Sequence, residues 1–143
     1  MRALTYPASI EAEGPGDFVV QFRDLPEAIT GAASAELALD LAADALAAAI
    51  EHYLDNGLEV PAPSPAVAGE HLVPIAPSSA ARLLLVREMA ARNVSGRALA
   101  GMLGKDEKAV RRAVAGKGAS LELTLAALRA LGVRPALATR LLS

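Results

Sequence analysis

Opposite charges divide this 143-residue chain into two halves, and no other feature of the sequence constrains its fold more. Residues 1–75 carry 2 basic and 12 acidic side chains, a balance of −10, whereas residues 76–143 carry 12 basic and 4 acidic side chains, a balance of +8. We therefore predict two domains, at 1–75 and 76–143, with different partners, the basic one meeting nucleic acid. Self-association of the oppositely charged halves is the alternative.

The first part of the acidic half shows the two-residue alternation of β-strands. Apolar side chains alternate with others over residues 4–12 and again over 18–22. Residues 13–17, EGPGD, lie between these runs, and their glycines and proline are typical of a reversal, so the sequence predicts a β-hairpin. Pro7 has no N–H to donate, so it must face away from a partner strand or sit at an edge. A short third strand is predicted at 27–30.

A long helix is predicted at 35–56, with Ser34 as its N-cap and Gly57 as its left-handed C-cap. Steps of four, four, seven and four place five carboxylates on one helix face without a Lys or Arg among them: Glu36, Asp40, Asp44, Glu51 and Asp55. This stripe is either a solvated outer face or a contact surface for a basic partner. Packing on the sheet is predicted for Leu39, Leu46, Ile50, Tyr53 and Leu54.

A stiff, proline-rich connector follows at 60–65, and a last strand is predicted at 71–75. The order β-β-β-α-β describes a small α+β layer.

Four short helices are predicted in the basic half, at 80–91, 96–103, 106–115 and 121–131. Serines stand at three of their starts and glycines close three of their ends: Ser79, Ser95, Ser120, Gly104, Gly116 and Gly132. A frayed final turn is predicted over 134–142. This half is therefore expected to be an all-α domain.

The two central helices, joined by a tight corner at Gly104, have helix-turn-helix form. Packing between them is predicted for Leu99, Leu103, Val110 and Val114. The second helix would present basic side chains to the major groove, where arginine reads guanine and other cations grip phosphate. The predicted DNA-binding residues are Ser95, Arg97, Lys105, Lys108, Arg111, Arg112 and Lys117. The alternative is a plain helical domain with solvated basic residues, and the neighbouring Asp106 and Glu107 would repel phosphate unless they cap the helix or accept from cytosine.

The order and spacing of several segments resemble the HicB antitoxin family. These segments are Tyr6-Pro7-Ala8, Gly16-Asp17-Phe18-Val19-Val20, Asp24 to Gly31, Ala38 to Tyr53, and Pro61-Ala62-Pro63-Ser64-Pro65. The stretch from Ser95 to Arg112, with the downstream residues Ala127 to Val133, is similar to the helix-turn-helix domain of phage-repressor-like regulators. The whole resemblance extends from about residue 1 to 133.

The resemblance implies a partial RNase H-like N-terminal domain that binds and blocks a HicA toxin, a small basic ribonuclease that cleaves messenger RNA. It also implies a C-terminal domain that forms a homodimer and binds the promoter of its own operon, with a higher hetero-oligomer when toxin is present. The acidic stripe is then the expected toxin contact, because a basic nuclease is its electrostatic complement. This sequence has Glu27 where many family members have glycine, and some members carry a ribbon-helix-helix domain instead.

Other functions are less favoured by the sequence. The chain has no cysteine, which excludes disulfides and thiolate chemistry, and no apolar run or leader suggests a membrane or secreted protein, so a cytoplasmic protein is expected. A metal-dependent nuclease would need clustered carboxylates, for which only Glu11, Glu13, Asp17 and Asp24 are candidates by type. We therefore predict a non-enzymatic protein without a cofactor. The remaining alternative is a stand-alone regulator whose N-terminal half senses a small molecule.

Overall fold

The computed structural model describes residues 4–116 and 120–137. The chain divides into two compact units, Met1–Ser79 and Ala80–Ser143. Within the described residues the first unit holds a four-stranded sheet and a long helix, and helices follow in the second, which confirms a mixed α+β fold. No helix in these ranges is long and apolar enough to cross a lipid bilayer.

The sheet of the first unit has the strand order β3-β2-β1-β4 with antiparallel neighbours. Its strands are β1 (Thr5–Gly14), β2 (Asp17–Phe22), β3 (Ile29–Ala32) and β4 (His71–Pro74). The predicted hairpin of β1 and β2 is confirmed. The prediction for β3 was wrong by two residues, because a turn intervenes in which Ala28 N donates to the carbonyl of Leu25 at 2.9 Å. This turn buries Leu25 and Ala28.

Pro7 lies in an interior strand but has a strand partner on one side only. The pairing of β1 with β2 begins at Ala8, opposite Phe22, whereas β4 pairs with β1 from Thr5 to Ala8. This position suits a residue that has no N–H to donate.

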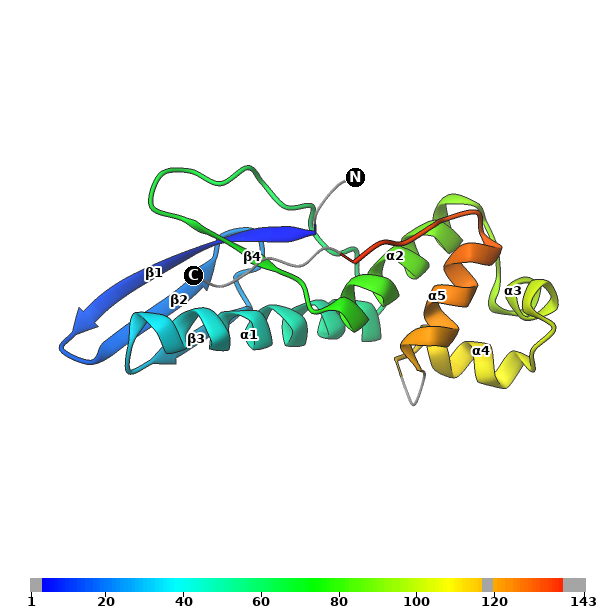
Figure 1. Ribbon diagram of the computed structural model, residues 1–143, viewed down its shortest axis with the longest axis horizontal. Coiled ribbons are helices and arrows are strands. Elements are labelled where there is room, and N and C mark those ends of the chain that lie inside the picture. The colour runs from blue at the N-terminus through cyan, green and yellow to red at the C-terminus, as the bar shows by residue number, and fades with distance from the viewer. Residues whose placement is uncertain (1–3, 117–119, 138–143) are drawn as a thin grey trace. The chain divides into compact units, whose positions relative to one another are not determined.

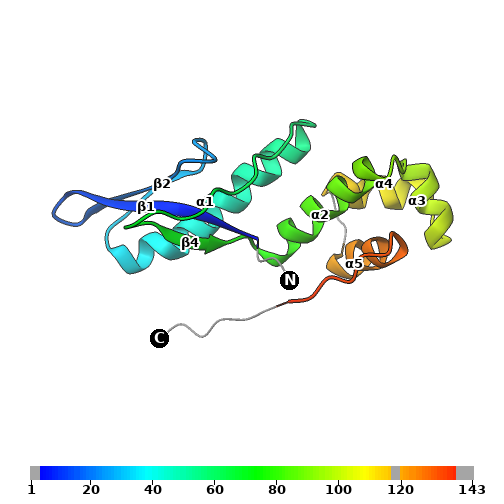
Figure 2. The ribbon, with the colours of Figure 1, turned by 90° about the horizontal axis from the view of Figure 1, so that it is seen from above.

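The helix α1 (Ala35–Asp55) covers one face of the sheet (Figures 1 and 2). The Ser34 hydroxyl accepts a hydrogen bond from the Leu37 N–H at 3.2 Å, which confirms the predicted N-cap, and Gly57 has the predicted left-handed φ of 65°. Its buried residues are Ala38, Ala42, Leu46, Ala49 and Ile50. The prediction for Leu39 was wrong: it is 40% exposed, although it lies on the same side of α1 as the buried Leu46 and Ile50, two and three turns further along the helix.

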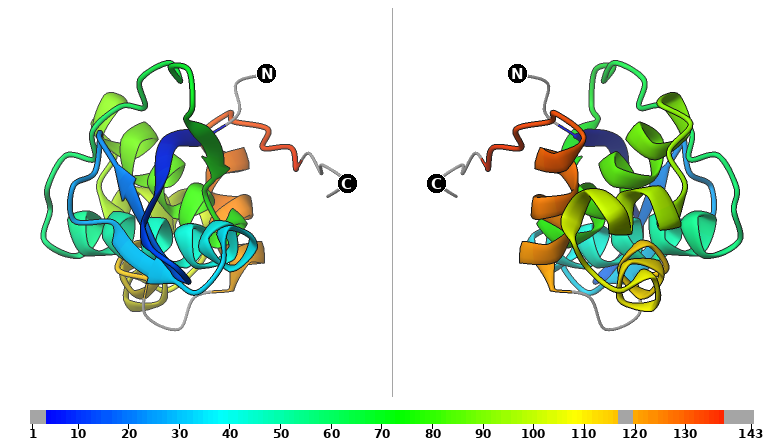
Figure 3. Two further views of the ribbon diagram at one scale, coloured as in Figure 1. Left: turned by 90° about the vertical axis from the view of Figure 1, so that its left-hand side faces the viewer. Right: turned by 90° about the vertical axis from the view of Figure 1, so that its right-hand side faces the viewer.

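The second unit contains all but the first three residues of α2 (Pro77–Ala91), together with α3 (Gly96–Leu103), α4 (Glu107–Val114) and α5 (Leu121–Ala130), grouped as the right-hand view of Figure 3 shows. Their common core includes Leu85, Leu99, Val110 and Leu128. The predicted start of α2 at Ala80 was three residues late, since Pro77 suits a first helical turn, where no N–H is needed. The helix predicted at 134–142 is also wrong over 134–137, which are not helical, and the remainder lies outside the described residues.

Candidate functional site

The acidic side chains of α1 share the helix face that points away from the sheet. With 3.6 residues per turn, the five positions fall within an arc of about 100°. Four of them are exposed and Glu51 is partly buried, whereas Ala38, Ala42 and Leu46 are buried on the opposite side. The structure therefore brings together the predicted set of Glu36, Asp40, Asp44, Glu51 and Asp55 as one surface, which we call the acidic face.

Two exposed leucines adjoin the acidic face. Leu37 is 52% exposed and Leu41 is 38% exposed, and they lie one turn apart on the same side of α1. Exposed apolar groups bordered by charge are the arrangement found at interfaces, in which a desolvated apolar centre is surrounded by a polar rim. Sequence reasoning missed these leucines because the helical pattern alone does not show which apolar side chains of α1 are covered by the sheet.

The helices α3 and α4 meet at a corner built from local signals. The Ser95 hydroxyl accepts from the Ala98 N–H at 3.1 Å and caps α3, and Gly104 ends it with a φ of 61°. Leu99 and Val110 are buried in the common core, against which Leu103 and Val114 pack, as predicted. The corner therefore holds α4 against α3 with a defined outer face.

The outer face of α4 is basic. Lys108, Arg111 and Arg112 are exposed on the side of the helix away from the buried Val110 and Ala113. Lys105, just before the helix, and Arg97, on α3, are also exposed. Lys117, the last of the predicted DNA-binding residues, lies outside the described residues.

The two acidic residues beside this face have different roles. Asp106 occupies the N-cap position of α4 without a side-chain capping bond. Glu107 forms an ion pair with Arg111 one turn on, with 2.6 Å between the carboxylate and guanidinium atoms. Exposed pairs of this type contribute only about 0.3–0.5 kcal/mol, so a phosphate or a base edge can replace Glu107 as the partner of Arg111 at small cost.

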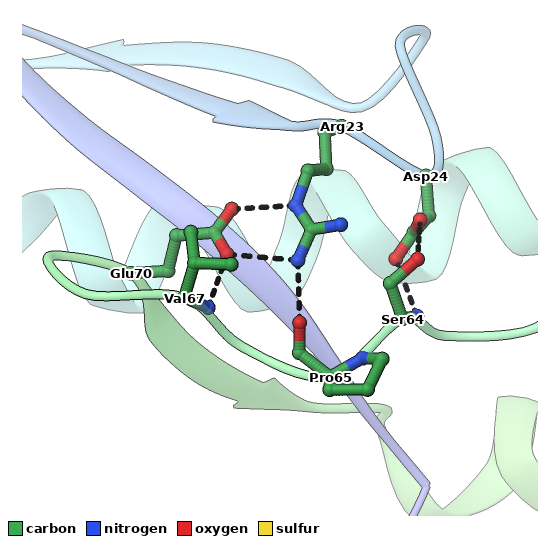
Figure 4. Close-up of polar contacts among 6 residues, drawn as sticks. All are labelled: Arg23, Asp24, Ser64, Pro65, Val67 and Glu70. Carbon is green, nitrogen blue, oxygen red and sulfur yellow. Dashed lines mark hydrogen bonds and ion pairs between the residues drawn. The ribbon is translucent and has the colours of Figure 1, made fainter.

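The segment between α1 and β4 is fastened to the end of β2 by two paired contacts that sequence reasoning missed (Figure 4). Arg23 donates from Nε and Nη2 to the carboxylate of Glu70, each at 2.9 Å. Asp24 accepts from the backbone N–H of Ser64 at 2.8 Å and from its hydroxyl at 2.6 Å. These contacts join residues 40 or more positions apart, which no local pattern can indicate.

These contacts also perturb the titration of one carboxylate. The hydrogen bond from Arg23, followed by the one from the Val67 N–H, lowers the pKa of Glu70 below its ordinary value. The four carboxylates considered for a metal-dependent nuclease do not form a cluster of free ligands. Asp24 accepts hydrogen bonds from Ser64, and Glu11, Glu13 and Asp17 are exposed. Across 4–116 and 120–137, no group of three or more His, Asp or Glu residues is placed to hold a metal ion.

Comparison with known proteins shows that residues 5–83 match a family described as HicB-like antitoxins of bacterial toxin–antitoxin systems. A protein named Antitoxin HicB 2 from Photorhabdus laumondii subsp. laumondii is 37% identical over 132 residues, which cover 92% of this chain and 93% of the relative. Antitoxin HicB of Escherichia coli K12 is 28% identical over 109 residues, with 76% and 79% covered. The first of these alignments spans nearly the whole chain and therefore includes both units.

Proposed function

This chain belongs to the HicB-like family of bacterial antitoxins, and we propose on that basis that it blocks a HicA-type mRNA-cleaving toxin and represses its own operon by binding promoter DNA. Residues 1–75, with a partial RNase H-like fold, are the neutralising domain. Residues 76–143 are the helix-turn-helix and dimerisation domain, so that toxin and antitoxin assemble into a higher hetero-oligomer. The protein acts in the cytoplasm without a cofactor and without catalysis of its own.

The toxin meets the acidic face of α1 together with Leu37 and Leu41. The observation that carries this assignment is the position of five carboxylates and two exposed leucines on the outer side of one helix. Rim charges act mainly on the rate of association, and buried apolar anchors act mainly on the rate of dissociation. The carboxylates therefore attract a basic protein and exclude RNA from its surface, while the leucines retain it.

The kinetic separation of these two roles tests the surface. The toxin encoded beside this gene is immobilised, and association and dissociation rates are measured against salt for the full-length chain. Asp40→Asn with Asp44→Asn should slow association severalfold and flatten its salt dependence. Leu37→Ser with Leu41→Ser should accelerate dissociation by about 10–100-fold, since half-buried leucines contribute about 1 kcal/mol each.

Leu39→Ser is the matched control for the leucine pair. Leu39 is an exposed leucine of the same helix, and it flanks the acidic face on the edge opposite to Leu37 and Leu41. Its replacement should therefore leave both rates within about twofold of the wild-type values. If both double variants keep wild-type kinetics while the chain still neutralises the toxin, the contact surface lies elsewhere. If the wild-type chain neither binds nor neutralises the neighbouring gene product, the antitoxin assignment itself fails.

The second unit binds DNA through α3 and α4. The helix α4 enters the major groove with Lys108, Arg111 and Arg112, while Ser95, Arg97, Lys105 and Lys117 contact the backbone or base edges around it. The support for this assignment is the basic, outward face of a short helix that is held against α3 by a buried core. A homodimer then reads two half-sites of a near-palindromic operator, about one helical turn apart.

Replacing Arg111 and Arg112 by Ala tests whether DNA binding and toxin neutralisation reside in separate units. Repression of a promoter reporter should be lost, whereas rescue from the toxin should persist. Loss of both activities in a protein that still unfolds cooperatively would show that the two functions do not reside in separate units.

A further inference from the structure

Arg82 is an arginine buried inside the second unit. It lies on α2 and is only 5% exposed. Its Nε donates a hydrogen bond of 2.8 Å to the carbonyl oxygen of Val114, the last residue of α4. The last carbonyls of a helix lack partners within the helix and carry partial negative charge, so a cation there is a favourable cap. Arg82 therefore reaches from α2 to the C-terminal end of α4.

Gly116 packs directly on the Arg82 side chain. A Cβ atom at this position would lie 2.9 Å from Nη1, 3.0 Å from Cζ and 3.2 Å from Nε of the guanidinium. The φ of Gly116 is also positive, at 72°, a conformation that glycine adopts without strain. Two independent constraints thus disfavour a side chain at this position: the positive φ and the space that the guanidinium occupies.

The two ends of α4 are held by different means. The N-terminal end follows the corner at Gly104, and Val110 anchors the middle of the helix in the core. At the C-terminal end Ala113 is buried and Val114 packs against the core, and Arg82 binds the last carbonyl. An eight-residue helix is about 12 Å long, so contacts at both ends set its direction as well as its position.

We propose that Arg82 is a positioning residue for DNA recognition, which orients the end of α4 without itself touching DNA. This proposal rests on the DNA-binding role assigned above. A guanidinium is suited to the task because its planar fork stays charged and donates in fixed directions, whereas a lysine is a single point charge. Loss of the cap lets the last turn of α4 shift and misplaces Arg111 and Arg112 relative to the groove.

The test uses the full-length chain and a duplex containing its own promoter. Dissociation constants for this duplex and for a scrambled one are measured at several salt concentrations, together with thermal unfolding. Arg82→Met should weaken promoter binding at least 10-fold and lower the ratio of specific to non-specific affinity. It should leave the salt slope for the scrambled duplex unchanged, because no exposed cation is removed, whereas Lys108→Ala should reduce that slope by about one unit.

Two further variants keep the test decisive if Arg82→Met does not fold. Arg82→Lys keeps the charge without the fork, and Gly116→Ala keeps the arginine but displaces its guanidinium. Both should weaken promoter binding and leave the salt slope for the scrambled duplex unchanged. Arg129→Met, which removes an exposed arginine of α5, is the control for net charge and should leave affinity within about twofold.

Three outcomes would overturn the proposal. Folded Arg82→Met protein with wild-type affinity would make Arg82 a stabilising residue only. A salt slope for the scrambled duplex reduced by about one unit would make it a direct phosphate contact. Absence of promoter binding by the wild-type chain would remove the DNA-binding role itself, and this outcome is recognised without any variant.

Discussion

The contact between Asp24 and Ser64 predicts a large cost for a substitution outside the hydrophobic core. Asp24→Ala removes the acceptor of two partly buried hydrogen bonds, 2.8 Å and 2.6 Å long. Hydrogen bonds to charged groups contribute about 1.5–3 kcal/mol each when buried. Partial exposure places these two at the weak end of that range, so the free energy of unfolding of the first unit should fall by about 2–3 kcal/mol. For a unit of this size the melting temperature should fall by roughly 10–20 °C.

Denaturant unfolding of the full-length chain measures this cost, and a double-mutant cycle with Ser64→Ala identifies its source. The cycle should give a coupling free energy of about 1 kcal/mol, because Ser64→Ala removes the hydroxyl bond to Asp24 and leaves the backbone N–H bond in place. Asp44→Ala, which removes an exposed carboxylate of α1, is the control and should change stability by less than about 0.5 kcal/mol. An Asp24→Ala cost as small as the control's, or strictly additive effects in the cycle, would refute the reasoning.

Three further predictions follow from other contacts of the fold. Because the pKa of Glu70 is lowered in the folded chain, its pair with Arg23 stabilises the fold at pH values above the ordinary carboxyl pKa near 4.5, and this stabilisation is lost as the pH falls through the folded pKa. In Glu70→Gln the midpoint of urea unfolding should therefore change less with pH between about pH 5 and pH 3 than it does in the wild type. Leu99→Ala should lower the unfolding free energy of the second unit by about 2–4 kcal/mol in denaturant titrations, because Leu99 is fully buried. Tyr6→Phe should cost about 1–2 kcal/mol by the same assay, since the Tyr6 hydroxyl donates to the carbonyl of Pro61 at 2.6 Å; an unchanged midpoint would mean that water replaces this donor.

Helix termini were the part of the fold that sequence predicted best. Ser34, Ser95 and Ser120 cap α1, α3 and α5 as expected, and Gly104 and Gly132 have the left-handed backbone expected after α3 and α5. Capping bonds join residues only two or three positions apart, so the residue types that form them are visible in the sequence. The hairpin of β1 and β2 was predictable for the same reason.

The candidate surfaces were only partly predictable. The spacing of the carboxylates placed them on one face of α1, because helical geometry is regular and needs no tertiary information. Which neighbouring apolar side chains stay exposed was not predictable: Leu37 and Leu41 adjoin the acidic face, and Leu39, expected to pack on the sheet, is 40% exposed. Helical spacing gives the side of α1 on which a side chain lies, but not whether another element covers it there.

By itself, the sequence determined the division into an acidic and a basic part, the α+β class, most helix ends and the family to which the chain belongs. Only the tertiary structure decided that β1 lies inside the sheet, that Arg23 pairs with Glu70, and that Arg82 is buried against the end of α4. The difference has one physical reason. Periodicity, capping and net charge are properties of short segments or of composition, whereas these contacts join residues about 30 to 50 positions apart, and such pairs come together only when the whole unit packs.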